Sequence, residues 1–180
     1  MGGVDKGLVT LNGQPLIKQV LDAIEPQVGA LVINANRNID LYRGLGYPVI
    51  QDVMGGYQGP LAGFSSALAA AATDYVIFLP CDAPLLPGDY VERMAAGLRS
   101  QNATLAVAHD GVRMQSVHAL MPCSIRPDLE QYLASGERKI DLWFARHPTA
   151  LVDFSDCAGA FRNINTQADR DNLQQKGDAA

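Results

Sequence analysis

Cysteine is scarce in this sequence. The three cysteines, Cys81, Cys123 and Cys157, are odd in number and far apart. They form no CxxC pair and no cysteine–histidine spacing of the kind that holds zinc. These absences argue against a disulfide-stabilised secreted domain and against a zinc-binding domain, and they favour a reduced, cytoplasmic protein.

Basic residues are outnumbered as well. There are 14 lysines and arginines against 19 aspartates and glutamates, which gives a net charge of −5. A nucleic-acid backbone needs a basic face, so we expect no nucleic-acid partner. Long apolar runs are also missing: the richest, "LAGFSSALAAAA" at 61–72, is too short to span a bilayer, and we see no signal peptide. We therefore expect no membrane association.

The sequence does contain enough apolar residues to form a core. They make up 48% of the 180 residues, and charged residues make up 18%, so disorder is not expected. A chain of this length can bury one substantial core. We predict a single domain over residues 1–180.

Apolar runs and amphipathic stretches alternate along the chain. Runs of strand type lie at 29–36, 47–52, 74–82, 103–110 and 117–122. Helical patterns lie at 14–27, 59–74, 87–101, 126–136 and 166–177. Near-continuous apolar strands between helices are typical of a sheet covered on both faces. The pattern predicts an α/β fold with three layers, αβα, and a mostly parallel sheet.

Polar residues end three of these predicted strands. Asn34, Asp52 and Asp82 follow the first, second and third run. Ligands bind beyond the carboxyl ends of parallel strands, so these side chains are candidates for a site. Each of Asn34 and Asp52 could instead accept a turn or helix-cap hydrogen bond. Three such residues at one edge favour a site.

Asp82 is the strongest of the three, because it follows the buried run "YVIFLP". A single carboxylate suits Mg²⁺, which takes one or two carboxylates and fills its other positions with water and phosphate oxygens. The alternative is a cap for the helix predicted at 87–101, but Asp89 is closer to that helix.

Lys6 lies within "GGVDKG". Glycines let a backbone approach a phosphate closely, and the ammonium supplies a point charge; a solvated lysine is the alternative. "GPLAG" at 59–63 opens a helix whose N-terminal N–H groups would face the same edge, or it is an ordinary helix start. Arg138 and Lys139 in "GERK" form either a solvated helix start or an anion contact.

The order of the short motifs resembles that of a known family. The series resembles the molybdenum cofactor guanylyltransferases, the MobA-type nucleotidyltransferases, from Met1 to about Gln175. The motifs are "MGGVDKG", "LNGQPLI", "NAN", "QD", "GPLAG", "PCDAP", "GERK" and "NINT". The resemblance implies a Rossmann-like nucleotide-diphospho-sugar transferase fold that uses Mg²⁺ as a cofactor and GTP as a substrate. The implied reaction joins GMP to Mo-molybdopterin and releases pyrophosphate, with molybdoenzymes or other molybdenum cofactor biosynthesis proteins as partners.

The resemblance also implies roles for individual residues. Lys6 matches the family's phosphate-binding lysine, and Asn34 and Asp52 match residues that hold the guanine nucleotide. Asp82 matches the carboxylate that binds both Mg²⁺ and nucleotide. Asn165, in "NINT", matches a residue that offers an amide oxygen near the metal.

The start of the chain departs from the family pattern. Family members begin with an apolar strand, "LAGG" and an arginine-containing stretch before reaching "MGGVDKG". We expect that the numbered chain starts at an internal methionine and lacks a central strand. Either the gene extends upstream or activity is largely lost, and the absence of in-frame upstream codons for this segment would contradict the first idea.

No histidine or glutamate stands out as a general base, and the implied reaction needs none. The attacking group is a terminal phosphate of molybdopterin, whose second pKa of about 6 leaves it largely ionised at neutral pH. Three alternatives stay open: a cytidylyl or sugar-phosphate nucleotidyltransferase of the same fold, a non-catalytic molybdopterin-binding remnant, and an unrelated flavodoxin-like binding domain.

Overall fold

The computed structural model describes residues 5–53 and 59–162. The helices are α1 (Leu16–Ile24), α2 (Ile39–Arg43), α3 (Pro60–Ala70), α4 (Tyr90–Ser100), α5 (Arg126–Ala134) and α6 (Ile140–Phe144). The strands are β1 (Thr10–Leu11), β2 (Gln14–Pro15), β3 (Ile33–Asn34), β4 (Val49–Ile50), β5 (Tyr75–Phe78), β6 (Leu105–His109), β7 (Met114–Pro122) and β8 (Thr149–Asp153). Short 3₁₀ helices are η1 (Lys6–Leu8), η2 (Glu25–Gln27), η3 (Cys123–Ile125) and η4 (Ser155–Phe161).

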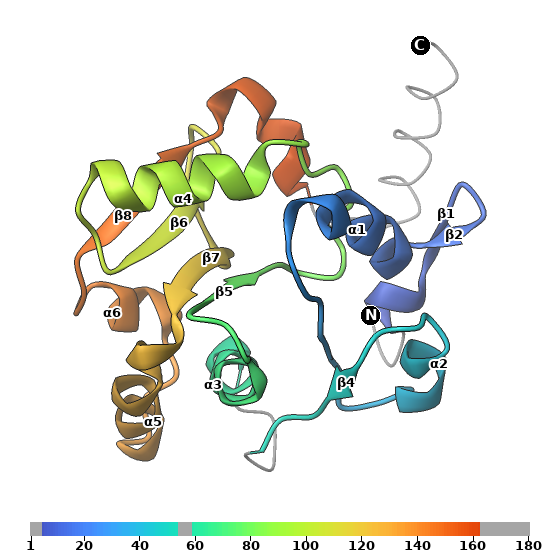
Figure 1. Ribbon diagram of the computed structural model, residues 1–180, viewed down its shortest axis with the longest axis horizontal. Coiled ribbons are helices and arrows are strands. Elements are labelled where there is room, and N and C mark those ends of the chain that lie inside the picture. The colour runs from blue at the N-terminus through green and yellow to red at the C-terminus, as the bar shows by residue number, and fades with distance from the viewer. Residues whose placement is uncertain (1–4, 54–58, 163–180) are drawn as a thin grey trace.

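The largest sheet has the strand order β5-β7-β6-β8 (Figure 1). β7 pairs antiparallel with both β5 and β6, whereas β6 and β8 are parallel. β5, β6 and β8 therefore run in one direction and β7 runs against them. The reason is local: only residues 110–113 join β6 to β7, and so short a connection permits a hairpin but no parallel crossover.

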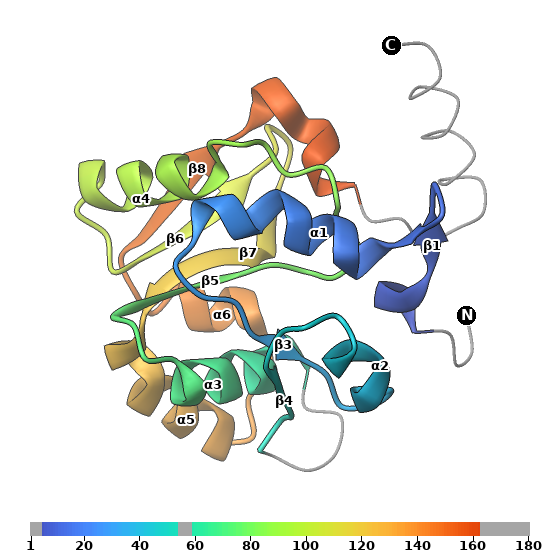
Figure 2. The same ribbon diagram turned by 45° about the vertical axis from the view of Figure 1, so that its right-hand side comes forward.

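Helices cover both faces of this sheet (Figures 1 and 2). Alternate side chains of β6 point to opposite faces. Leu105 and Val107 join a core with α3 and α5, while Ala106 and Ala108 join a second core with α4 and η4. This arrangement gives the three layers that the apolar strands predict.

A second, smaller sheet consists of β3 and β4, which are parallel. It packs with α1 and α2 around Ile33, Ile17, Leu21 and Tyr42. Among the described residues, β3 pairs only with β4, and β5 pairs only with β7. In Figure 2, β5 lies between β7 and the β3–β4 pair. The described strands thus pair in three sheets, counting the β1–β2 hairpin, rather than in one continuous, mostly parallel sheet.

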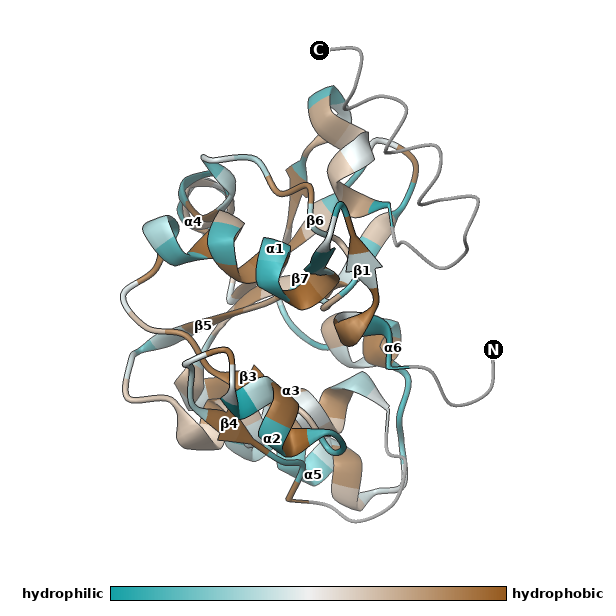
Figure 3. Cartoon of the chain, turned by 90° about the vertical axis from the view of Figure 1, so that its right-hand side faces the viewer, coloured by the Kyte–Doolittle hydropathy of each residue, from teal (hydrophilic) through white to brown (hydrophobic). Residues whose placement is uncertain are grey.

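The hydropathy of the helices and strands agrees with which of their sides are covered (Figure 3). In Figure 3, β4 and β5 are coloured as hydrophobic, whereas α1 alternates between hydrophobic and hydrophilic residues. α1 buries one stripe, which consists of Leu16, Ile17, Val20, Leu21 and Ile24. A helix that lies on a sheet buries one side only, whereas a strand between two helix layers is covered on both. No helix in the described part of the chain is long and apolar enough to cross a membrane.

Candidate active site

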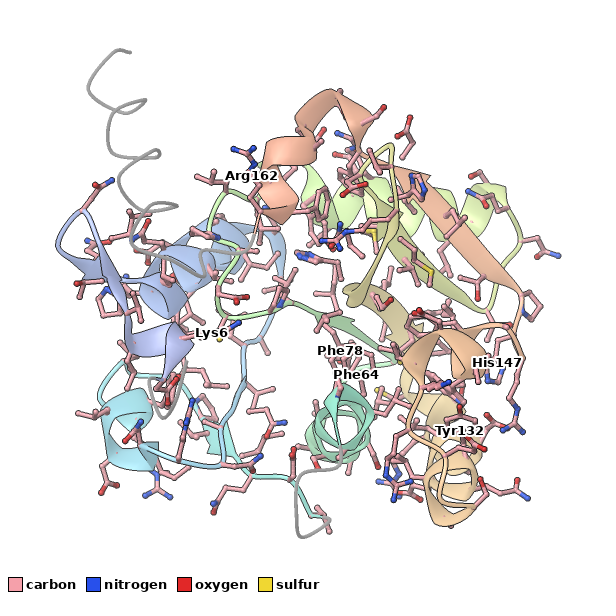
Figure 4. The ribbon with its side chains drawn as sticks, turned by 180° about the vertical axis from the view of Figure 1, so that it is seen from behind. Lys6, Phe64, Phe78, Tyr132, His147 and Arg162 are labelled. Atoms are coloured by element: carbon pink, nitrogen blue, oxygen red, sulfur yellow. The ribbon has the colours of Figure 1, made fainter. Side chains whose placement is uncertain are left out.

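Lys6 and Asp82 lie side by side although 76 positions separate them in the sequence. The Lys6 Nζ is 3.4 Å from the Asp82 Oδ2. Asp82 follows β5, and its side chain is 7% exposed, whereas the Lys6 side chain is 50% exposed. Figure 4 shows Lys6 on η1, beside the segment that follows β5. An ion pair with a half-exposed lysine contributes little to stability.

The backbone beside Lys6 packs tightly on the segment after β5. A Cβ on Gly7 would lie 2.6 Å from the Tyr42 hydroxyl oxygen and 3.3 Å from the Cys81 Cβ. Only glycine fits there. Burial, and next the neighbouring Asp82 carboxylate, raise the pKa of the Cys81 thiol to about 11. The thiol is therefore neutral and is no nucleophile at neutral pH.

Asn34 and Asp52 form a second pair. The Asn34 Nδ2 donates a hydrogen bond of 2.8 Å to the Asp52 Oδ1. β3 and β4 are parallel with Asn34 opposite Ile50, so the two residues leave the sheet at the same edge. The predicted proximity of these two strand-end residues is confirmed.

Asn36 is a third member of this group, and it was not predicted from the sequence. Its Nδ2 donates to the Asp52 Oδ2, and its Oδ1 accepts from the Asp52 backbone N–H, both at 2.8 Å. Each Asp52 oxygen thus accepts one amide hydrogen and keeps further lone-pair capacity. The second asparagine of "NAN" was the available signal.

The N-terminal turns of α3 lie against Asn34 and Asp52. A Cβ on Gly63 would be 2.7 Å from the Asn34 Nδ2 and 3.6 Å from the Asp52 Oδ1. Ser66, one turn further on, accepts a hydrogen bond of 3.0 Å from the Val53 backbone N–H. The expectation that "GPLAG" opens a helix is confirmed, because α3 begins at Pro60; a contact of its N-terminal N–H groups with an anion stays a prediction.

Asp5 was also not identified from the sequence. Its carboxylate accepts hydrogen bonds from the Tyr42 hydroxyl and the Asn38 side chain and pairs with Arg37. Arg37 and Asn38 directly follow Asn36. Asp5 therefore joins the Lys6 segment to the loop that follows Asn34 and Asn36.

Arg138 and Lys139 are used differently. The Arg138 guanidinium donates to the backbone carbonyls of Leu133 and Glu137, at the C-terminal end of α5. Lys139 precedes the first residue of α6, as expected for a helix start. α5 and α6 lie on the other side of α3 from η1 (Figure 1). An anion contact by Arg138 or Lys139 stays a prediction, and Asn165 lies outside the described residues.

The histidines, to which the sequence assigns no role, have structural surroundings. His118 is buried against Tyr90 and Phe161. The His147 Nε2 is 3.0 Å from an Asp128 oxygen, and the His109 Nδ1 accepts from the Gly111 N–H.

Among the described residues, no group of three or more His, Cys, Asp or Glu side chains could hold a metal ion. A metal cage built by the protein alone is therefore not present in this part of the chain. A single buried carboxylate such as Asp82 does fit Mg²⁺ that is shared with a nucleotide, because phosphate oxygens and waters then complete the coordination.

Comparisons with known proteins show the family of this chain. Residues 1–150 match the family model of the MobA-like NTP transferase domain. A molybdenum cofactor guanylyltransferase of Shewanella loihica is 49% identical over 175 residues, 97% of this chain and 89% of that protein. One of Shewanella baltica is 46% identical over 173 residues, which cover 96% of this chain and 88% of the relative.

Solved structures show the same fold. Molybdopterin-guanine dinucleotide biosynthesis protein A of Archaeoglobus fulgidus has a TM-score of 0.79 at 21% identity, covering 99% of this chain and 93% of that one. The 2-C-methyl-D-erythritol 4-phosphate cytidylyltransferase of Thermus thermophilus has a TM-score of 0.72 at 16% identity, covering 96% and 94%. The fold is therefore the Rossmann-like nucleotidyltransferase fold. The matched domain and the sequence relatives show that this chain belongs to the MobA-like NTP transferases, and among them to the molybdenum cofactor guanylyltransferase family.

Proposed function

We propose that this protein transfers GMP from GTP to Mo-molybdopterin, which forms the molybdopterin guanine dinucleotide cofactor and releases pyrophosphate. The relatives that are 46–49% identical over almost the whole chain carry this activity in their names. The observations that support roles for individual residues are the Lys6–Asp82 ion pair and the Asn34–Asp52 hydrogen bond.

In this reaction an oxygen of the molybdopterin phosphate forms a bond to the α-phosphorus of GTP. The bond from that phosphorus to the bridging oxygen breaks, and pyrophosphate leaves with the electron pair. The attacking phosphate is already ionised at neutral pH, so no side chain has to remove a proton. The protein must align the groups and offset their negative charge.

Lys6 supplies the positive charge for this step. The Lys6 side chain is half exposed and its ammonium lies next to the buried Asp82 carboxylate. It can therefore contact the β- and γ-phosphates of a nucleotide bound at the protein surface. A lysine acts on phosphate as a point charge and needs no fixed fork geometry. The positive charge of Lys6 would stabilise the negative charge of the departing pyrophosphate.

Asn34 and Asp52 hold the nucleoside in this proposal. Both Asp52 oxygens are fixed by amides yet keep lone pairs that accept from guanine N–H groups or from ribose hydroxyls. Preformed hydrogen bonds hold the carboxylate in one orientation before the ligand arrives, which lowers the entropic cost of binding.

We further propose Mg²⁺ as the cofactor, held by Asp82 together with the triphosphate oxygens. When bound, it neutralises charge on the α-phosphate and on the leaving group. Asp82 suits this role because its carboxylate is buried in the turn that follows β5, where packing fixes its position. The recipients of the product in this proposal are molybdoenzymes.

The test is pyrophosphate release by purified protein with GTP, Mg²⁺ and Mo-molybdopterin. Asp82→Ala should reduce the rate by roughly a thousandfold, the scale on which a main electrostatic contact acts. The matched control is Asp22→Ala, which removes an exposed aspartate that pairs with Lys18 on α1. Near-normal turnover in Asp82→Ala would show that the metal assignment is wrong.

The choice of nucleotide needs its own measurement, because cytidylyltransferases share this fold. A nucleotide that binds the folded state raises its melting temperature. GTP should raise that temperature and CTP should not; the opposite result favours a cytidylyltransferase. Stabilisation by GTP without pyrophosphate release would indicate a non-catalytic binding protein.

A further inference from the structure

The Asp5 carboxylate is nearly buried and has three partners. Its side chain is 12% exposed. The Tyr42 hydroxyl donates to its Oδ1 at 2.7 Å, the Asn38 Nδ2 donates to its Oδ2 at 2.9 Å, and the Arg37 Nε lies 3.4 Å from its Oδ2. Hydrogen bonds that involve a charged partner are roughly twice as strong as those between neutral groups. The carboxylate is therefore firmly held by the segment 37–42.

This use of the carboxylate is unusual for its position. Asp5 is the residue just before η1, where an aspartate side chain commonly caps the first N–H groups of its own helix. Here the side chain makes no such hydrogen bond, and only its backbone carbonyl accepts from the Leu8 N–H, at 3.2 Å. The Asp5 side chain instead connects the segment that begins η1 to the segment 37–42.

The partner segment is a rigid support. The Tyr42 ring is buried among Ile17, Leu21 and Ile33. Burial, and next the hydrogen bond to Asp5, raise the pKa of the Tyr42 phenol, so the hydroxyl stays protonated and donates. Asn38 has φ +51 and directly precedes α2, whose Leu41 N–H bonds to the Asn38 carbonyl.

Lys6 lies between two fixed points. On one side is Asp5, and on the other is Gly7, whose Cα faces the Tyr42 hydroxyl and Cys81 with no room for a Cβ. The lysine side chain is long and flexible, so the position of its ammonium depends on where the backbone is anchored. Tyr42 touches both fixed points.

We propose that Asp5, through Tyr42, is a positioning residue: it fixes the Lys6 backbone so that the ammonium meets the β- and γ-phosphates of a nucleoside triphosphate. The inference rests on the role of Lys6 in the proposed function. Asp5 does not touch the nucleotide; it acts through Lys6. We call the hydrogen bond between Asp5 and Tyr42 the clamp. Loss of the clamp leaves Lys6 present but lets its ammonium sample positions away from the phosphates.

The readout is the preference for GTP over GMP, measured as two dissociation constants by calorimetry. GMP lacks the two phosphates that Lys6 meets. Tyr42→Phe removes one hydroxyl and keeps the ring, and Asp5→Asn removes the charge. Each should weaken GTP binding by roughly tenfold, the value of one good hydrogen bond, and leave GMP binding within about twofold.

Matched controls make the same chemical changes elsewhere. Tyr132→Phe removes a hydroxyl that donates to the Lys139 carbonyl, and Asp128→Asn neutralises a carboxylate bonded to Trp143 and His147. Both lie on the α5–α6 side of the molecule. They should leave the ratio of the two constants unchanged, even where they lower the melting temperature.

Lys6→Ala separates the failure of this inference from the failure of the proposed function. If Lys6→Ala loses the preference for GTP and the Asp5 and Tyr42 variants keep it, the clamp is overturned and the role of Lys6 stands. If Lys6→Ala keeps the preference, both are overturned. Equal weakening of GTP and GMP in Tyr42→Phe would indicate a purely structural role and also overturn the clamp. Should Asp5→Asn fail to fold, Tyr42→Phe alone decides.

Discussion

At the scale of single residues, the candidate site is built from polar groups that fix one another before any ligand is present. Asp52 is the clearest case, because it has an amide on each oxygen and a backbone N–H that bonds to Asn36. Asp5 is a second case. Such networks restrict side-chain rotation, and the entropy lost on binding a nucleotide is then smaller.

Gly63 gives a prediction at this scale. Alanine normally favours a helix over glycine by about 1 kcal/mol, so Gly63→Ala in α3 would ordinarily stabilise the protein. Here the new Cβ would lie 2.7 Å from the Asn34 Nδ2 and would push this amide off Asp52. We expect GTP affinity to fall by roughly tenfold, measured by calorimetry.

The matched control is Gly88→Ala, where a Cβ would meet nothing within 4 Å. That variant should bind GTP as the unaltered protein does. Unchanged affinity in Gly63→Ala would mean that the Asn34–Asp52 contact plays no part in binding.

At the scale of elements, α4 and β8 are in unusually close contact. A Cβ on Gly97 would lie 2.5 Å from the Val152 Cγ2 and 3.5 Å from the Val152 Cβ. Val152 is buried in β8, and a β-branched side chain has few other rotamers. The helix therefore approaches the sheet at the one position of α4 without a side chain.

Gly97→Ala should lower the free energy of unfolding by about 1–3 kcal/mol, the usual cost of overpacking. Urea denaturation followed by circular dichroism measures it. The double variant Gly97→Ala/Val152→Ala should recover part of the loss, because the valine methyl groups that clash are gone. As a control, Ala96→Gly on the exposed side of α4 should cost only the helix-propensity difference of about 1 kcal/mol.

At the scale of the whole molecule, the two cores share the central strands. β6 places Leu105 and Val107 in one core and Ala106 and Ala108 in the other. Losing one helix layer would expose the same strands that the other layer covers. This sharing fits the prediction of a single domain over residues 1–180, which stays a prediction.

The folding equilibrium should depend on pH through His118. This side chain is 2% exposed, its Nε2 has no hydrogen-bond partner in the structure, and the Tyr90 hydroxyl lies 3.4 Å from its Nδ1. Burial lowers the pKa of His118 from 6.5 to about 4. Between these two values the unfolded chain binds a proton that the folded chain does not, so the free energy of unfolding falls as the pH falls.

The expected loss between pH 7 and pH 5 is about 2 kcal/mol from this residue. Urea denaturation at pH 7 and pH 5, on the unaltered protein and on His118→Phe, isolates it from the carboxylates. His118→Phe should show a shallower fall over this range. An identical fall in both proteins would mean that His118 is protonated in the folded state as easily as in the unfolded one.

The sequence by itself predicted α1, α3, α4, α5, the strands from β3 to β7 and the helix layers on both faces of a sheet, but not α2, α6 or β8. It also placed Asn34 and Asp52 at the ends of β3 and β4 and Asp82 after β5, whereas the helix predicted at 166–177 lies outside the described residues. It could do so because burial leaves a local period in the chain: near-continuous apolar runs for covered strands, and one apolar stripe for helices such as α1. The ordered motif series extended this to the family, which the matched domain and the relatives confirm.

Only the tertiary structure decided which of these residues meet. The pairing of strands in three sheets, the Asn36 contacts to Asp52 and the Asp5–Tyr42 contact have no local signature. The physical reason is that a hydrogen bond between residues 37 or 76 positions apart depends on how whole elements pack. A pattern of neighbouring residues records whether a side chain is buried, but it does not record against which partner.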